Sequence, residues 1–379
     1  MSDITLTNAV RANLNTLTAT ADMMSEVQNK LATGKKVNSA LDNPNSFFTA
    51  KGLENRAGDL GTLLDDMGQS VQTLKAADKG IEAISDLVDA AKAKANQALQ
   101  TSDQSERAAY SKEYNELLSQ MEDLAKDSSY KGKNLLAGNG NDLSVTFNEN
   151  GSSSLSISAV DYTDSSAGLG LSDIAEGTTT TAQLEVGSNG AVAASVNIVD
   201  NASFTAGDTL SVTDGAGNEL GTLEVTATTK IQDLVDFVDG LEGASASYTA
   251  ADGDLNLVGE GSNITLTNNT GPADLVNAGT NGGFTTDAGI EASLTALKGA
   301  QDKLRAQAST FGTNLSIVEN RQDFTTDLIN TLQEGAGELT LANTNVEGAN
   351  LLALQTQQQL ASTSLSMASQ ASQNVLRLF

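Results

Sequence analysis

Asp252, Asp254 and Asn256 are spaced like the oxygen ligands that open a calcium-binding loop. However, Leu257 occupies the position where such a loop needs glycine, and Asn263 occupies the position of its closing glutamate. Apolar and polar residues also alternate through this segment, which indicates a β-strand. We therefore expect a structural role for these residues and no metal site.

Two other patterns that could bind or transform a ligand are incomplete. Gly34-Lys35 and Gly132-Lys133 lack the upstream glycine and the following Ser or Thr of a phosphate-binding loop. The chain contains no His and no Cys, which excludes a Ser-His-Asp triad, thiolate catalysis, disulfides and the zinc-metalloprotease signature. Paired carboxylates are too common in so acidic a chain to indicate acid–base catalysis. We predict no enzyme activity, no catalytic, cofactor-binding or metal-binding residues, and no cofactor.

The charge distribution restricts the partners. The formal net charge is -27, and between Gly138 and Asp287 there are 21 acidic residues and a single basic one, Lys230. Such acidity disfavours nucleic acids and anionic membranes as partners. We therefore expect no nucleic acid and no membrane partner, and the acidic segment is expected to form a solvated surface.

The C-terminal stretch has no charged residue between Glu347 and Arg377, although it is rich in Gln and Ser. It is too polar to span a membrane. Apolar residues recur at helical spacing, which indicates a helix buried among other helices; a disordered Gln/Ser tail is the alternative. The predicted C-terminal seam consists of Leu354, Ala361, Leu365, Ala368, Val375 and Phe379.

A similar repeat of seven residues marks the N-terminal region. Gly34 is a suitable residue to end this helix, and Pro44 indicates a turn before the next one. Residues 1–20 lack the apolar core of a secretory signal peptide. The predicted N-terminal seam consists of Val10, Leu14, Leu17, Ala21, Met24 and Leu31.

Two long helices are predicted, one from Asn45 to about Leu99 and one from Ile290 to a break at Gly335-Ala336-Gly337. A third helix is expected around residues 110–124. Heptads sustained over this length are typical of coiled coils. The predicted long-helix core consists of Leu60, Met67, Leu74, Ile81, Val88, Leu297, Leu304, Phe311 and Val318.

Between Gly138 and Asp287 the chain is rich in Gly, Ser, Thr and Asn, with short apolar alternations that predict strands. One helix is expected near Ile231–Leu241. The predicted fold is mainly α with a β-rich insertion, in which long coiled-coil-like helices from both chain ends pair. We assign 1–44 and 345–379 to the terminal helices, 45–165 and 285–344 to the long-helix domain, and 166–284 to a β-rich insert.

Several segments resemble bacterial flagellins. They include Leu31–Ala40 after the first helix, Ala76–Ile81 and Glu319–Phe324 in the long helices, and the C-terminal run from Ala349 to Phe379. The resemblance covers about 1–135 and 290–379, whereas the centre matches loosely around Ile231–Leu266.

This resemblance implies a secreted, extracellular subunit of the bacterial flagellar filament that assembles with copies of itself for swimming motility. It implies that the terminal helices form the inner tube of the filament, the long helices the outer tube, and the insert a variable exposed surface. The implied partners are a flagellar export chaperone, the filament cap and hook-junction proteins. A hook–filament junction protein, or a surface adhesin that uses the acidic insert, remains an alternative.

Overall fold

The computed structural model of the chain describes residues 8–177, 180–185, 192–200, 204–270 and 276–377. It divides into two compact units. Unit 1 consists of Met1–Gly68, Thr146–Ser154 and Asn320–Phe379, and unit 2 consists of Gln69–Val145 and Leu155–Glu319.

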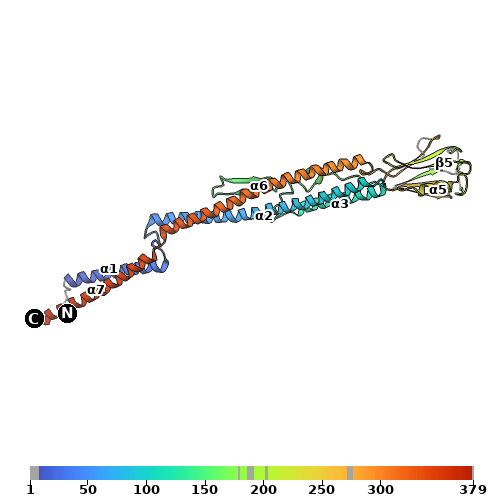
Figure 1. Cartoon of the computed structure of the whole chain (residues 1–379). Helices are drawn as coiled ribbons and strands as arrows, with labels where there is room; N and C mark the ends of the chain where they lie inside the picture. The colour runs from blue at the N-terminus through green and yellow to red at the C-terminus, as the bar shows by residue number, and fades with distance from the viewer. Residues whose placement is uncertain (1–7, 178–179, 186–191, 201–203, 271–275, 378–379) are drawn as a thin grey trace. The chain divides into compact units, whose positions relative to one another are not determined.

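Unit 1 contains two pairs of helices. Helix α1 (Asn8–Thr33) lies beside α7 (Thr344–Arg377), as Figure 1 shows. The first part of α2 (Pro44–Gln100) packs against the last part of α6 (Asp287–Thr340) through a buried cluster. That cluster is formed by Ala57, Leu60 and Leu332.

In unit 2 the rest of α2 and the rest of α6 run antiparallel. A third helix, α3 (Gln104–Asp127), belongs to the same bundle. Gln301 on α6 donates a hydrogen bond to Asp89 on α2, and Lys75 on α2 lies 3.5 Å from Glu319 on α6. Lys94 on α2 and Glu113 on α3 form an ion pair of 2.5 Å. The two long helices, with 57 and 54 residues, therefore return along each other as the heptads predicted.

The predicted end of α6 at Gly335-Ala336-Gly337 is wrong, because the helix continues to Thr340. A glycine inside a helix costs only about 1 kcal/mol relative to alanine. Here Ala336 is buried, so tertiary packing offsets that cost. The break falls three residues later, and Asn343 then caps α7 by accepting hydrogen bonds from the backbone N–H groups of Asn345 and Val346.

The segment after α3 contains a hairpin of β1 (Leu143–Thr146) and β2 (Ser154–Ile157), followed by the short helix α4 (Ser165–Gly168). The insert then contains two antiparallel sheets with the strand orders β3-β7-β6 and β5-β4-β8-β9. Its remaining elements are β3 (Thr180–Glu185), η1 (Ile198–Asp200), β4 (Thr209–Thr213), β5 (Glu219–Glu224), α5 (Ile231–Asp239), β6 (Ala244–Thr249), β7 (Asp254–Gly259), β8 (Ile264–Asn268) and β9 (Val276–Ala278).

Both sheets and α5 share one apolar core. Along β4, β7 and β8 every second side chain is buried, as expected for strands with one face toward a core. Helix α5 contributes Ile231, Leu234 and Val238 to the same core. The fold is therefore mainly α with a β-rich insertion, as predicted.

A polar joint holds the start of α3 to the start of α6 in unit 2. The buried guanidinium of Arg107 donates to the backbone oxygens of Thr101 and Thr285, at 2.7 and 3.0 Å, and to the carboxylate of Asp287 at 2.6 Å. The side-chain amide of Gln104 also donates to the Thr285 oxygen at 3.2 Å. These bonds fix the start of α3 to the start of α6.

Gly80 on α2 lies against the segment that follows α3. A Cβ atom at this position would stand 2.7 Å from Leu136 Cδ1 and 2.7 Å from Ser128 Cβ. We predict that Gly80→Val destabilises unit 2 by about 1–3 kcal/mol, because extra atoms in a packed region force neighbours to move. Thermal unfolding followed by circular dichroism measures the effect.

The matched control is Gly299→Ala on α6, where a Cβ atom would meet nothing within 4 Å. It should be neutral or stabilise the protein by up to about 1 kcal/mol through its helix propensity. Equal melting temperatures for Gly80→Val and the wild type would contradict the packing described.

Asp208 is a buried carboxylate in the insert, at the start of β4. It accepts hydrogen bonds from the Thr270 hydroxyl, from the Asn268 amide at 2.8 Å and from the Thr205 N–H at 2.8 Å. These bonds, that of Thr270 first, hold the pKa of Asp208 below its usual value. Because the folded-state pKa is lowered, the bonds stabilise the insert above the unfolded pKa of about 3.9, and this contribution is lost as the pH falls through the folded-state pKa.

Asp208→Asn should therefore lower the melting temperature of the insert at pH 7, and the difference from the wild type should shrink as the pH is lowered toward 2. Asp252→Asn, in an exposed turn, is the control and should change stability by less than about 0.5 kcal/mol. A difference between Asp208→Asn and the wild type that stays constant with pH would refute this assignment.

Candidate assembly surface

The pairing of α1 with α7 is antiparallel and is fixed where the two helices meet the long ones. The backbone N–H of Lys36 donates to Thr340 O at 2.7 Å, and that of Ala342 donates to Gly34 O at 2.9 Å. Gly34 has φ +69°, a left-handed conformation that glycine adopts without strain, and it ends α1 as predicted.

The predicted N-terminal seam coincides only in part with the buried face of α1. Val10, Leu17, Met24 and Leu31 are half-buried, and so is Ala21, whereas Leu14 remains 44% exposed.

Two lines of covered side chains run along α1. The first contains Val10, Leu17 and Met24, and the second lies three residues later in each case, at Asn13, Thr20 and Val27. Thr20 and Val27 are buried, and the Thr20 hydroxyl donates to Thr16 O at 2.8 Å, which satisfies it inside the helix. The burial thus runs one residue before Leu14 and Ala21, two members of the predicted seam. The alternation of three and four residues is the signal that identifies this face, although two polar residues obscure it.

On α7, four members of the C-terminal seam are half-buried: Leu354, Ala361, Leu365 and Ala368. Leu351 and Gln358 complete the same face. The side chain of Val375 and the whole of Phe379 lie outside the described residues.

Helix α7 also carries a second apolar line that the seam prediction missed. It turns away from the first face and consists of Val346, Ala353, Leu360 and Met367, at steps of seven. Leu360 is 65% exposed and Met367 is 59% exposed. The helix therefore has two apolar faces, and only one of them lies on the α1 side.

The predicted long-helix core is buried at each of its nine positions. In unit 2, Leu74, Ile81 and Val88 on α2 and Leu297, Leu304, Phe311 and Val318 on α6 belong to the helix bundle, and Leu60 and Met67 are buried in unit 1. These side chains hold the long helices together within one chain and offer no free surface.

A short ordered turn connects α1 to α2. One carboxylate oxygen of Asp42 accepts hydrogen bonds from the N–H groups of Asn38 and Ser39, each at 2.9 Å. These backbone bonds hold the pKa of Asp42 below its usual value. We call residues 38–42 the elbow turn; Leu41 within it is 95% exposed.

The described residues contain no group of three or more acidic side chains placed to hold a metal ion. Asp254 and Asn256, from the calcium-like sequence, lie in strand β7, as the alternation predicted. None of the described helices has an apolar stretch long enough to cross a membrane.

Comparisons with known proteins point to a family. Residues 4–141 match the bacterial flagellin N-terminal helical region, and residues 294–379 match the bacterial flagellin C-terminal helical region. Flagellin A of Rhizobium meliloti is 28% identical over 422 residues, covering 100% of both chains. Flagellin B of Rhizobium meliloti strain 1021 is 48% identical over 62 residues, which are 16% of each chain.

Among solved structures, FlgL of Xanthomonas campestris is similar with 14% identity and a TM-score of 0.31, over 76% of this chain and 99% of that one. The matched helical regions contain α1, α2, α3, α7 and nearly all of α6, which are the elements that form the helix pairs and the bundle. The chain belongs to the bacterial flagellin family.

Proposed function

We propose that this chain polymerises into the flagellar filament by packing its α1–α7 pair against the same pair in other copies. The flagellin family consists of structural, non-enzymatic filament subunits, and the proposal concerns how this member assembles. The observation that supports it most is incomplete burial. Between Thr344 and Ala371, where the side chains of α7 are described, none is fully buried.

A helix in this state gains little from its own chain. Isolated helices are marginal in water, and packing of an apolar face supplies most of their stability in proteins. The line of Leu360 and Met367 is still in contact with water, and covering one such side chain completely contributes roughly 1.5–3 kcal/mol. Since one exposed line recurs along several turns, neighbouring copies can cover it continuously.

The absence of charge between Glu347 and Arg377 suits this arrangement. Burying an unpaired charge is costly, and like charges repel when identical helices are brought together. The Gln, Ser and Thr side chains of α7 carry no charge to desolvate and can form hydrogen bonds across helices. Charge neutrality therefore favours contact between copies of this helix.

Repeated packing of one face against a different face of the next copy gives heterologous contacts that do not close on themselves. Such contacts generate a helical polymer. In this arrangement residues 1–44 and 345–379 form the inner tube, 45–165 and 285–344 the outer tube, and 166–284 the exposed surface.

We also propose three kinds of partner other than copies of the chain itself. They are an export chaperone, the filament cap and the hook-junction proteins. The site of action is the secreted, extracellular filament.

Two substitutions on α7 test the two faces. Leu365→Asp on the α1 side and Leu360→Asp on the opposite side should each reduce polymerisation more than tenfold, because each buries an unpaired carboxylate. The measurement is filament mass sedimented from purified protein, with the melting temperature of unit 2 unchanged as evidence of folding.

Ser362→Asp is the matched control, since it places the same charge on the same helix at an exposed position that belongs to neither line. It should polymerise within about twofold of the wild type, as surface substitutions usually have small effects. Wild-type polymerisation by Leu360→Asp would contradict the role of the second line.

The proposal as a whole is tested by electron microscopy of purified chain after addition of sheared filament seeds. Long filaments support a filament subunit. Chains that remain monomeric under these conditions, and in a salting-out salt that strengthens apolar burial, would favour the junction-protein alternative.

A further inference from the structure

The elbow turn presents a leucine to solvent from an ordered backbone. Leu41 is 95% exposed, more than any other large apolar side chain of the described residues. The hydrogen bonds from Asn38 and Ser39 to Asp42 hold the turn that carries it. A side chain on a preorganised turn loses little conformational freedom on binding, which favours its use as a contact.

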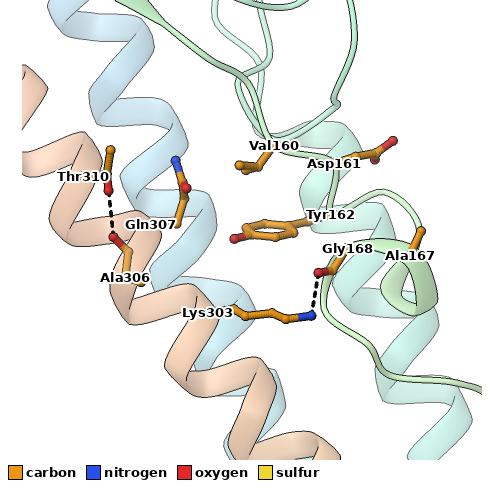
Figure 2. A pocket seen from close by; sticks show the side chains of 9 residues that line it. All are labelled: Val160, Asp161, Tyr162, Ala167, Gly168, Lys303, Ala306, Gln307 and Thr310. Carbon is orange, nitrogen blue, oxygen red and sulfur yellow. Dashed lines mark hydrogen bonds between the residues drawn. The ribbon is translucent and has the colours of Figure 1, made fainter.

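Unit 2 contains a concave groove, whereas the elbow turn protrudes. It has a volume of about 470 Å³ and lies between residues 160–168 and α6, with Tyr162 on one side and Ala306 and Thr310 on the other. Figure 2 shows the Tyr162 ring directed from its loop toward α6. Tyr162 is almost fully buried, so the ring forms a wall of the groove and little of it meets solvent.

The groove is built from ordered backbone on both sides. The N–H of Tyr162 donates to Leu136 O at 2.9 Å, and Asp164 caps α4 by accepting from Ser166 N and Ala167 N at 3.0 Å. The Lys303 ammonium crosses from α6 and donates to Leu169 O at 3.0 Å. The groove is thus preformed, and its lining has one basic residue, Lys303, and one acidic residue, Asp161, whose carboxylate accepts hydrogen bonds from the N–H and the hydroxyl of Thr163.

We propose that, in the filament, Leu41 of one copy inserts into the groove between residues 160–168 and α6 of another copy. This inference rests on the proposed assembly and adds a contact outside the terminal helices. It assigns the groove an occupant with an apolar tip followed by a carboxylate.

Size and charge support a second copy as the occupant. A cavity of roughly 150 Å³ already accepts benzene, so the groove has room for a leucine and part of its turn. Asp42 follows Leu41 and is anionic, while Lys303 is the cation of the groove. An attraction between these opposite charges on two copies would favour one register of association over others. An exposed apolar residue and a separate pocket on the same chain also form the kind of heterologous contact that extends a polymer.

Disulfide cross-linking tests the contact directly, because the chain has no native cysteine. Leu41→Cys combined with Ala306→Cys is assembled under reducing conditions and then oxidised. Disulfides form only when the two Cβ atoms come within about 4.5 Å, so we expect a ladder of covalent oligomers on a denaturing gel.

The control combines Leu41→Cys with Glu291→Cys, an exposed position about 22 Å from Ala306 along α6. A ladder at least tenfold stronger for the first pair supports the contact. Filaments without a ladder, or with equal ladders for both pairs, overturn it while leaving the proposed assembly intact. Failure of the wild-type chain to form filaments would instead refute the proposed assembly.

A double-mutant cycle gives a second test without cysteine. Leu41→Ser removes the apolar tip, and Ala306→Trp fills the groove from an exposed position. Each should slow filament elongation about tenfold, and the double variant should be no slower than either single one, since both remove the same contact. Multiplicative effects, or no effect of either variant, would overturn the proposal.

Discussion

Burial of one apolar line along α2 and its counterpart along α6 is the interaction on which the rest of the chain depends. Leu60 to Val88 on one helix and Leu297 to Val318 on the other are buried at steps of seven. This burial pairs the two helices in antiparallel orientation. The first residues of α2 and the last residues of α6 therefore lie together. Next to them, the backbone hydrogen bonds donated by Lys36 and Ala342 hold the start of the α1–α7 pair.

The same repeat has different consequences in the two pairs of helices. In α2 and α6 the lines are covered within the chain, so the bundle is complete in one copy. In α7 the inward line is only half-covered and a further line is exposed. Under the proposed assembly such a chain separates stability from association, because the bundle is buried within one copy whereas the terminal pair leaves apolar side chains for neighbouring copies to cover.

Much of this arrangement could be predicted from sequence, because heptads over long segments have few interpretations. The boundaries of α2, the end of α1 at Gly34 and helix α5 follow from periodicity and from Pro and Gly positions. The end of α6 could not be predicted, since local propensity at residues 335–337 yields to the packing of Ala336. Strand β6 could not be predicted either, because small residues such as Ala244 and Ala246 give a weak apolar alternation although they pair with β7.

The candidate assembly surface was predictable in part. The C-terminal seam follows from the spacing of Leu354, Ala361 and Leu365, whereas the inward line of α1 includes Thr20, whose hydroxyl is satisfied within its own helix. A hydrophobic pattern cannot reveal a polar residue that is buried in this way. The exposure of Leu41 depends on the local turn that Asp42 organises, and the hydrophobic pattern does not reveal which side chain that turn presents to solvent.

The charges on one edge strand of the insert affect how inserts of different copies interact when they lie close together. In the sheet β5-β4-β8-β9, the outer strand β5 pairs with β4 alone among the described strands, and it begins and ends with exposed glutamates, Glu219 and Glu224. Unpaired edges tend to pair with other strands, and charged side chains on an edge oppose this because like charges repel. Where many inserts lie close together, repulsion between the glutamates of neighbouring β5 strands opposes the edge-to-edge pairing that begins aggregation.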